Sequence, residues 1–221
     1  MKIAHFFGLT PGPAVVFMVA AFAFSAFSSH AAQAESPITP NPPTTASNNA
    51  TAIFAGGCFW CIEKDFEKLP GVIEVESGYT AGRTKNPTYE TVSAGGTGHA
   101  EAVRVIYDPK KVSYPQLVDY FWHHIDPTVK DRQFCDVGTQ YRSGIYWQNE
   151  TERKAAEDSR DVLLKSARFK VIYTEVEPAS TFYPAEEYHQ DYYKKNPVRY
   201  NYYRASCGRD ARVAEVWGEK K

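Results

Sequence analysis

The chain passes from a short apolar run into a helical pattern at Gly56–Cys61, and this turn limits its fold more than any other feature. Thr51–Ala55 has the length and composition of a strand. The two glycines that follow permit backbone angles and close approaches that a residue with a Cβ resists. Apolar residues then recur with a period near 3.6, at Phe59, Ile62, Phe66 and Leu69. The pattern predicts a strand, a tight turn and a helix with Cys58 in its first turn.

A cysteine at this place in a fold is a candidate nucleophile. Unpaired backbone N–H groups and the positive end of the helix dipole favour a thiolate, so we expect the pKa of Cys58 to lie below its usual value. The alternative is a buried structural cysteine, which is the more common kind. Two glycines at the start of a predicted helix are unusual beside such a cysteine, and we therefore interpret Cys58 as reactive.

The first 34 residues have the three parts of a secretory signal peptide. They comprise the basic Lys2, an apolar run over Ala14–Phe27 and a small-residue cleavage site at Ala32-Gln33-Ala34. The apolar run is too short for a membrane span, which needs ~20 residues. We expect a signal peptide at 1–34, a flexible Pro-, Ser- and Thr-rich linker at 35–50 and one catalytic domain at 51–221. The mature protein is expected to be exported, most simply to the periplasm, without membrane insertion after cleavage.

Charge and cysteine content narrow the classes of function. Without residues 1–34 the chain carries 24 basic and 26 acidic residues, a net charge of −2. Nothing in this balance indicates a nucleic-acid partner. Four cysteines remain in the mature chain, and two structural disulfides are one use for them in an oxidising compartment. The four cysteines are Cys58, Cys61, Cys135 and Cys207.

Alternating strand and helix patterns indicate an α+β fold. Further strands are predicted at 72–79, 102–107, 143–147 and 171–176, and helices at 114–124 and 150–167. We expect a two-layer α/β sandwich, a ferredoxin-like plait, with a mixed sheet and a long irregular C-terminal tail that contains one short helix at about 186–194. The polar segment 126–143 is too long for a simple connection and is expected beside the functional site.

Four motifs together resemble those of the A-class peptide methionine sulfoxide reductases. They are Gly-Gly-Cys-Phe-Trp at 56–60, Asn-Pro-Thr-Tyr at 86–89, Gly-His-Ala-Glu-Ala-Val at 98–103 and Gly-Thr-Gln-Tyr-Arg-Ser at 138–143. The resemblance runs in order from about Ala52 to Trp217, nearly the whole mature chain. Four motifs in order are much more specific than one cysteine turn.

The resemblance implies a role for each matching residue. Cys58 is the implied nucleophile and Glu101 the implied acid. Without the motif, the sequence would indicate that Glu101 is an exposed carboxylate at the start of a strand. The implied substrate-binding residues are Phe59, Trp60, Tyr89, Asp136 and Tyr141. Cys58 would attack the sulfur of the S epimer of methionine sulfoxide, free or in proteins, releasing methionine and leaving a sulfenic acid. The implied biological role is repair of oxidised exported proteins.

A second thiol must then condense with the sulfenic acid, and the chain offers three. We rank Cys207 first, because it lies in a tail context like that of resolving cysteines in the family, then Cys61 and then Cys135. Cys61 stands where many members carry a small residue, one helical turn from Cys58. An external thioredoxin-like dithiol would reduce the resulting disulfide. No cofactor and no metal are expected, and the protein is expected to be a monomer.

Two other classes of protein fit part of the pattern. A general thiol-disulfide oxidoreductase would use Cys58-x-x-Cys61, but that class places its tryptophan before the first cysteine, and here Trp60 follows it. A zinc or disulfide module would use all four cysteines. Zinc sites commonly bring a second close pair, however, and Cys135 and Cys207 are far apart in the sequence.

Overall fold

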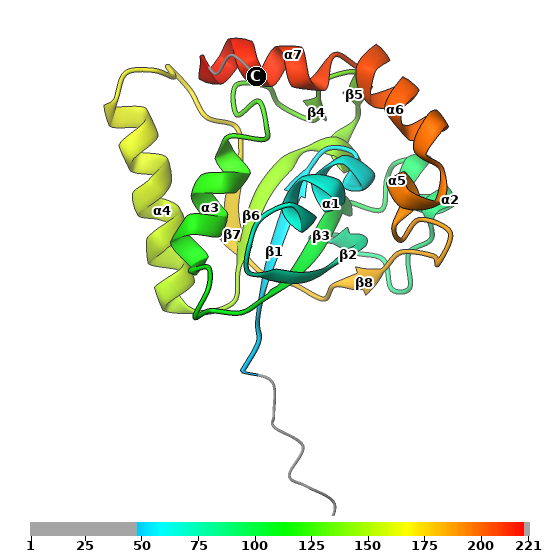
Figure 1. Ribbon diagram of the computed structural model, residues 1–221, viewed down its shortest axis with the longest axis horizontal. Helices are drawn as coiled ribbons and strands as arrows, with labels where there is room; N and C mark the ends of the chain where they lie inside the picture. The colour runs from blue at the N-terminus through cyan, green and yellow to red at the C-terminus, as the bar shows by residue number, and fades with distance from the viewer. Residues whose placement is uncertain (1–47, 219–221) are drawn as a thin grey trace, which may run out of the picture. The chain divides into compact units, whose positions relative to one another are not determined.

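A six-stranded mixed sheet forms the centre of the fold in the computed structural model, which describes residues 48–218 (Figure 1). The predicted signal peptide and nearly all of the predicted linker lie outside the described residues. The strand order is β7-β6-β1-β3-β2-β8. The strands are β1 Ala50–Gly56, β2 Val72–Thr80, β3 Ala100–Tyr107, β6 Ser143–Trp147, β7 Glu175–Pro178 and β8 Tyr183–Pro184.

The four inner strands form the predicted ferredoxin-like plait. β6, β1, β3 and β2 are antiparallel neighbours, with α1 (Phe59–Glu67) between β1 and β2 and α3 (Tyr114–Trp122) between β3 and β6. This is the β-α-β-β-α-β order of that fold. After α4 (Glu150–Lys165), β7 pairs with β6 in parallel and makes the sheet mixed. The α+β sandwich predicted from the sequence is therefore confirmed.

The main core lies between the sheet and its helices, and Phe54 of β1 is at its centre. The Phe54 ring stacks on Phe66 of α1 at 5.0 Å and on Phe121 of α3 at 5.1 Å between centroids. Truncation of such a buried ring costs about 3–5 kcal/mol. Ile53, the next residue along the strand, packs in a smaller cluster with Tyr146, as the alternation of a strand requires. The apolar residues of β1 therefore hold both helices against the strand that leads to Cys58.

The secondary-structure elements near the site are short and lie within longer loops. The loop between β2 and β3 contains α2 (Tyr89–Ser93), and segment 126–143 contains β4 (Arg132–Gln133), β5 (Asp136–Val137) and a 3-10 turn, η1 (Thr139–Tyr141). No helix among residues 48–218 is long and apolar enough to span a membrane.

Two sequence expectations differ from the structure. The strand predicted at 171–176 begins only at Glu175, where pairing with β6 becomes available. The tail predicted as irregular apart from a short helix at about 186–194 is helical over α5 (Tyr192–Lys195), α6 (Pro197–Ser206) and α7 (Arg209–Trp217). The buried side chains of α6 are Tyr200 and Arg204. A stripe made of a tyrosine and an arginine gives no apolar period, so the pattern did not reveal this helix.

Candidate active site

The turn after β1 requires both of its glycines. Gly57 has φ +81°, and a Cβ there would lie 2.5 Å from Cβ of Gln133. A Cβ at Gly56 would lie 2.5 Å from Cδ1 of Ile62, inside the first turn of α1. This tight turn makes Cys58 the N-cap of α1, where its carbonyl accepts the first helical hydrogen bonds.

Glu101 reaches the same turn from the neighbouring strand. Because β1 and β3 are antiparallel, with Phe54 opposite Val103, the end of β1 lies beside the start of β3. The backbone N–H of Phe59 donates to Oε2 of Glu101 over 3.1 Å. Glu101 is only 3% exposed, and burial raises its pKa to about 8 against the opposing effect of the Phe59 N–H. The side chain therefore holds a proton at neutral pH and can act as an acid.

A pocket of about 80 Å³ opens over this pair. The structure brings together all seven residues that the sequence assigned to catalysis and substrate binding, although they come from four separate segments. The residues that line this pocket are Cys58, Phe59, Trp60, Tyr89, Glu101, Asp136, Tyr141 and Tyr203.

Phe59 and Trp60 supply the aromatic wall of the pocket. Phe59 is 1% exposed, and its ring lies 6.2 Å from that of Trp60 between centroids. The indole of Trp60 stacks on Tyr192 at 3.8 Å, and its Nε1 donates to Nδ1 of His189 over 3.0 Å. Trp60 is therefore partly buried and held by two contacts from the C-terminal part of the chain, whereas periodicity alone places it on the surface.

The two predicted tyrosines can donate hydrogen bonds into the pocket. Tyr89 is the first residue of α2, and Tyr141 is the last residue of η1. Burial raises the pKa of both phenols, and the nearby Glu101 raises them further. Both hydroxyls consequently stay protonated, which suits a site that must hold a polar oxygen.

Asp136 carries a partner that the sequence did not reveal. The hydroxyl of Tyr203, on α6, donates to Oδ2 of Asp136 over 2.6 Å. Burial raises the pKa of Asp136, while this hydrogen bond and Arg209 oppose the shift. A hydrogen bond with Tyr203 also favours the thiolate of Cys58. Tyr203 is thus shared by the carboxylate and the thiol, and it reaches them because the tail is helical.

The pKa of Cys58 shifts in the direction opposite to the one the sequence predicted. Burial raises it well above the usual value, and the neighbouring Cys61 and Glu101 add to the rise. The helix terminus does not lower the pKa of Cys58, because the side chain is only 5% exposed and the loss of hydration of the thiolate outweighs the helix dipole. The pKa of Cys61 falls to about 7, first through a hydrogen bond with Cys58 and then through Arg209 and Arg204. The pair therefore loses its first proton with the charge on Cys61.

The four cysteines divide into two pairs. Cys135 and Cys207 form a disulfide, whereas Cys58 and Cys61 are free and buried. The bond between Cys135 and Cys207 contradicts a zinc site built from all four cysteines. In this redox state Cys207 is already bonded, which leaves Cys61 as the free thiol next to Cys58. Cys135 is exposed and precedes Asp136 of the pocket lining, so the disulfide lies at the border of the site.

Comparison with known proteins identifies a family over the same residues. Residues 50–221 match the family model described as peptide methionine sulfoxide reductase. The chain is 49% identical over 176 residues to the peptide methionine sulfoxide reductase MsrA of Bacillus licheniformis, covering 79% of this chain and 97% of the relative. It is 54% identical over 151 residues to that of Ligilactobacillus salivarius, covering 68% and 88%.

Solved structures of similar proteins share the fold. Mxr1 from Saccharomyces cerevisiae in reduced form is 34% identical with a TM-score of 0.65, covering 69% of this chain and 88% of its own. Methionine sulfoxide reductase A of Corynebacterium diphtheriae is 36% identical with a TM-score of 0.62, covering 74% and 86%.

Proposed function

This chain belongs to the peptide methionine sulfoxide reductase family, and we propose that it reduces the S epimer of methionine sulfoxide, free or in proteins, to methionine. The observation that carries the proposal is the pairing of Cys58 with a protonated Glu101 in one small pocket. The aromatic wall of Phe59 and Trp60 provides an apolar seat for the S-methyl group. The hydroxyls of Tyr89 and Tyr141 can hold the sulfoxide oxygen.

In the reductive step, the thiol of Cys58 passes its proton to the thiolate of Cys61, with which it is hydrogen-bonded. The Cys58 sulfur attacks the sulfoxide sulfur, and Glu101 gives its proton to the oxygen. The sulfur–sulfur bond formed by the attack and the sulfur–oxygen bond of the substrate both break as the hydroxyl transfers to the Cys58 sulfur, so that methionine leaves and Cys58 carries the oxygen as a sulfenic acid. The substrate gains two electrons and Cys58 loses them.

We propose that Cys61 resolves the sulfenic acid when Cys207 is bonded to Cys135. Cys61 lies one turn after Cys58 on α1, and condensation of its thiol with the sulfenic acid forms a disulfide and releases water. The sequence alone ranked Cys207 above Cys61. The pairing of Cys207 with Cys135 is the observation that supports the reverse order for this step.

The Cys135–Cys207 disulfide is the proposed entry point for the reductant. Cys58 and Cys61 are 5% and 1% exposed, so a protein dithiol has poor access to a bond between them, whereas Cys135 is exposed. A thioredoxin-like dithiol would reduce Cys135–Cys207. The two thiols released would then reduce Cys58–Cys61 by exchange and re-form their own bond. Each cycle consumes one external dithiol per sulfoxide.

The signal-peptide pattern at 1–34 supports export, most simply to the periplasm, and repair of oxidised proteins there. The reductant would then be a thioredoxin-like protein of the same compartment. The linker at 35–50 would separate the signal from a monomeric catalytic domain that uses no metal or organic cofactor.

Assay with the two epimers of a methionine sulfoxide peptide and dithiothreitol tests the activity. We expect reduction of the S epimer alone and its loss in Cys58→Ser; a fully active Cys58→Ser would contradict the mechanism. Disulfide mapping after one turnover without reductant tests the resolving step. Wild type should gain a Cys58–Cys61 bond, and Cys135→Ser should stay active with dithiothreitol but lose turnover with a thioredoxin. A Cys58–Cys207 bond would restore the order that the sequence predicted.

A further inference from the structure

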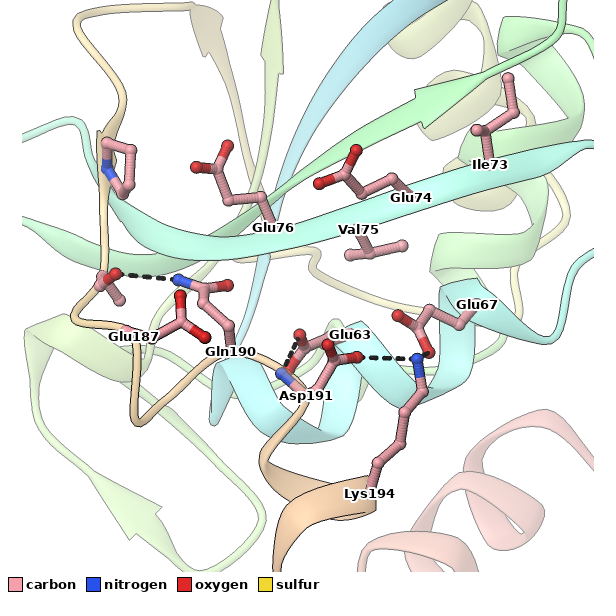
Figure 2. Close-up of a pocket in the computed structure, with 12 residues that line it drawn as sticks. Glu63, Glu67, Ile73, Glu74, Val75, Glu76, Glu187, Gln190, Asp191 and Lys194 are labelled. Atoms are coloured by element: carbon pink, nitrogen blue, oxygen red, sulfur yellow. Dashed lines mark hydrogen bonds and ion pairs between the residues drawn. The ribbon is translucent and has the colours of Figure 1, made fainter.

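A turn of six residues, 186–191, links the walls of the pocket to the sheet without lining the pocket itself. Gln190 anchors it to β2, where its Oε1 accepts from the N–H of Ser77 and its Nε2 donates to the carbonyl of Ser77, each over 2.9 Å. The N–H of Asp191 donates to Oε1 of Glu63 on α1 over 2.8 Å (Figure 2). The 186–191 turn is therefore fixed to two regular elements beside the site.

Glu186, the first residue of the turn, holds one wall of the pocket. Its Oε1 accepts from the N–H of Tyr89 over 2.9 Å, and its Oε2 accepts from the hydroxyl of Tyr79 over 2.9 Å. Tyr79 belongs to β2 and is opposite Glu101 in the β2–β3 register. Glu186 thereby fixes the start of α2 relative to the strand pair that carries the acid.

His189 holds the other wall. Its Nδ1 accepts from Nε1 of Trp60 over 3.0 Å, and its ring centroid lies 5.0 Å from that of Phe59 and 4.4 Å from that of Tyr89. The side chain is 2% exposed. One buried imidazole thus contacts three of the residues that line the pocket.

These contacts require a neutral imidazole in one tautomer. Indole Nε1 is only a donor, so Nδ1 of His189 must be the acceptor and Nε2 must carry the hydrogen. Nε2 is buried and has no hydrogen-bond partner among the described residues. A second proton on Nδ1 would place two N–H groups against each other. Protonation of His189 and its hydrogen bond with Trp60 therefore exclude each other.

We propose that His189 is a positioning residue for the reductase, holding the indole of Trp60 in the wall that receives the S-methyl group, and that acid weakens substrate binding by protonating it. The inference rests on the proposed function, because it assigns the pocket to methionine sulfoxide. His189 is not among the residues that line the pocket. Its effect belongs to substrate binding, and the protein would lose affinity below the pH at which the imidazole titrates.

The groups around His189 determine that this loss of substrate affinity occurs at acid pH. Burial lowers the pKa of His189, and the negative charge of Glu186 opposes the shift. The other titratable groups against the ring are the phenols of Tyr89 and Tyr188, at 4.4 Å and 4.2 Å between centroids. The pKa of both phenols is raised, so they stay neutral over the range in question. The imidazole is accordingly neutral at pH 7 and takes up a proton only below the ordinary range for histidine.

Two substitutions of His189 separate positioning from general damage to the fold. His189→Leu removes the acceptor, whereas His189→Asn keeps an acceptor oxygen attached at the same carbon as Nδ1 of histidine. With a methionine sulfoxide peptide at pH 7.5, we expect KM to rise about 3- to 10-fold in His189→Leu, the loss of one hydrogen bond, with a smaller change in kcat. His189→Asn should restore KM to within about 2-fold. His123→Asn, on the far end of α3, is the matched control for a changed histidine.

Two further readouts distinguish this role from a structural one. In wild type KM should rise at acid pH as the imidazole takes up a proton, and in His189→Asn this rise should vanish. In a Trp60→Phe background, which lacks the indole donor, His189→Leu should add little further change in KM. A wild-type KM in His189→Leu, an unaltered acid limb in His189→Asn, or an undiminished effect in Trp60→Phe would each overturn the proposal. None of these outcomes concerns the loss of all activity in Cys58→Ser, so failure here leaves the proposed function intact.

Discussion

The backbone N–H of Phe59 donates a hydrogen bond to Oε2 of Glu101 over 3.1 Å, although 42 residues separate the two. This bond ties the turn that carries Cys58 to the strand that carries the acid. It occupies one carboxyl oxygen, which leaves the other free to carry the proton. The orientation of the acid relative to the thiol is therefore set by the main chain, before any substrate enters.

Glu101→Gln should leave a folded protein with little activity. The amide oxygen can still accept from Phe59, but the side chain has no proton to transfer, and loss of a general acid costs about 10²- to 10⁴-fold in rate. In wild type the raised pKa of about 8 predicts that kcat/KM falls as pH rises through 8, because Glu101 is then ionised. The pH dependence of kcat/KM for both proteins checks this.

The fall of kcat/KM above pH 8 should be absent from the residual activity of Glu101→Gln, since glutamine does not titrate. If the variant keeps both the wild-type rate and the same fall above pH 8, the acid is another group. Cys61, whose pKa lies at about 7, is the neighbour whose titration would then have to be considered.

Residues close in sequence gave the more reliable predictions. The strand at 51–55, the glycine turn and the helix from Phe59 depend on local pattern alone, and the structure has them as β1 and α1. Glu101 and Tyr141 required the resemblance to a family, because their local sequence indicates only a strand start and a loop. The structure explains why they meet: antiparallel pairing places the end of β1 beside the starts of β3 and β6.

Long-range features were not accessible from the sequence. Tyr203, His189 and Glu186 act on the pocket from a tail with little aliphatic period, so their contacts could not be inferred. The density of aromatic residues at 182–203 was the signal that could have located them. The pKa of Cys58 depends on burial, which local pattern does not report, and the Cys135–Cys207 bond joins segments 72 residues apart.

Tyr203→Phe should lower activity through Cys58 rather than through the fold. The hydroxyl donates to Asp136 and also favours the Cys58 thiolate, so its removal should raise the pKa of Cys58 further. We expect kcat to fall about 10-fold at pH 7, the effect of one pKa unit on the thiolate fraction. Alkylation of Cys58 by iodoacetamide as a function of pH measures the shift directly. An unchanged alkylation profile with reduced kcat would instead assign Tyr203 to substrate binding.

Arg209→Met should destabilise the turn at Gly56 and also raise the pKa of Cys61. Arg209 is 1% exposed; Nη1 donates to the carbonyl of Gly56 over 3.2 Å and Nη2 to that of His124 over 2.9 Å. We expect the loss of these two buried hydrogen bonds to lower the free energy of unfolding by about 2–4 kcal/mol. The lost cation should also raise the pKa of Cys61 above its value of about 7.

Urea denaturation and alkylation of Cys61 in a Cys58→Ser background measure the two effects of Arg209→Met. Arg212→Met, one turn further along α7, removes a cation that pairs with Asp126 over 2.7 Å; it is the control for the pKa of Cys61, which should stay unchanged. A Cys61 pKa that is the same in Cys58→Ser and in Cys58→Ser/Arg209→Met would show that Arg209 does not lower it.

Glu63→Gln should make the protein more stable in alkaline solution. Glu63 is 1% exposed beside an acidic hollow lined by Glu67, Glu74, Glu76, Glu187 and Asp191 (Figure 2). Burial raises the pKa of Glu63 to about 7, against the opposing hydrogen bonds from Asp191 and Ser77. Because the folded-state pKa lies above the unfolded value, this group contributes most to stability below about pH 4.5, and that contribution is lost as pH rises through 7. Glutamine keeps an acceptor and carries no charge. Relative to wild type, the variant should therefore gain up to about 3 kcal/mol between pH 5 and pH 8.

Urea denaturation of both proteins at pH 5, 6.5 and 8 tests this sign. Glu74→Gln removes the same charge from the exposed rim of the same hollow, and we expect no comparable pH-dependent gain there. A gain of equal size in both variants would mean that repulsion among the carboxylates lining the hollow, and not burial of Glu63, causes the effect. A difference between Glu63→Gln and wild type that stays constant across the three pH values would mean that Glu63 is ionised throughout, held by the N–H of Asp191 and the hydroxyl of Ser77.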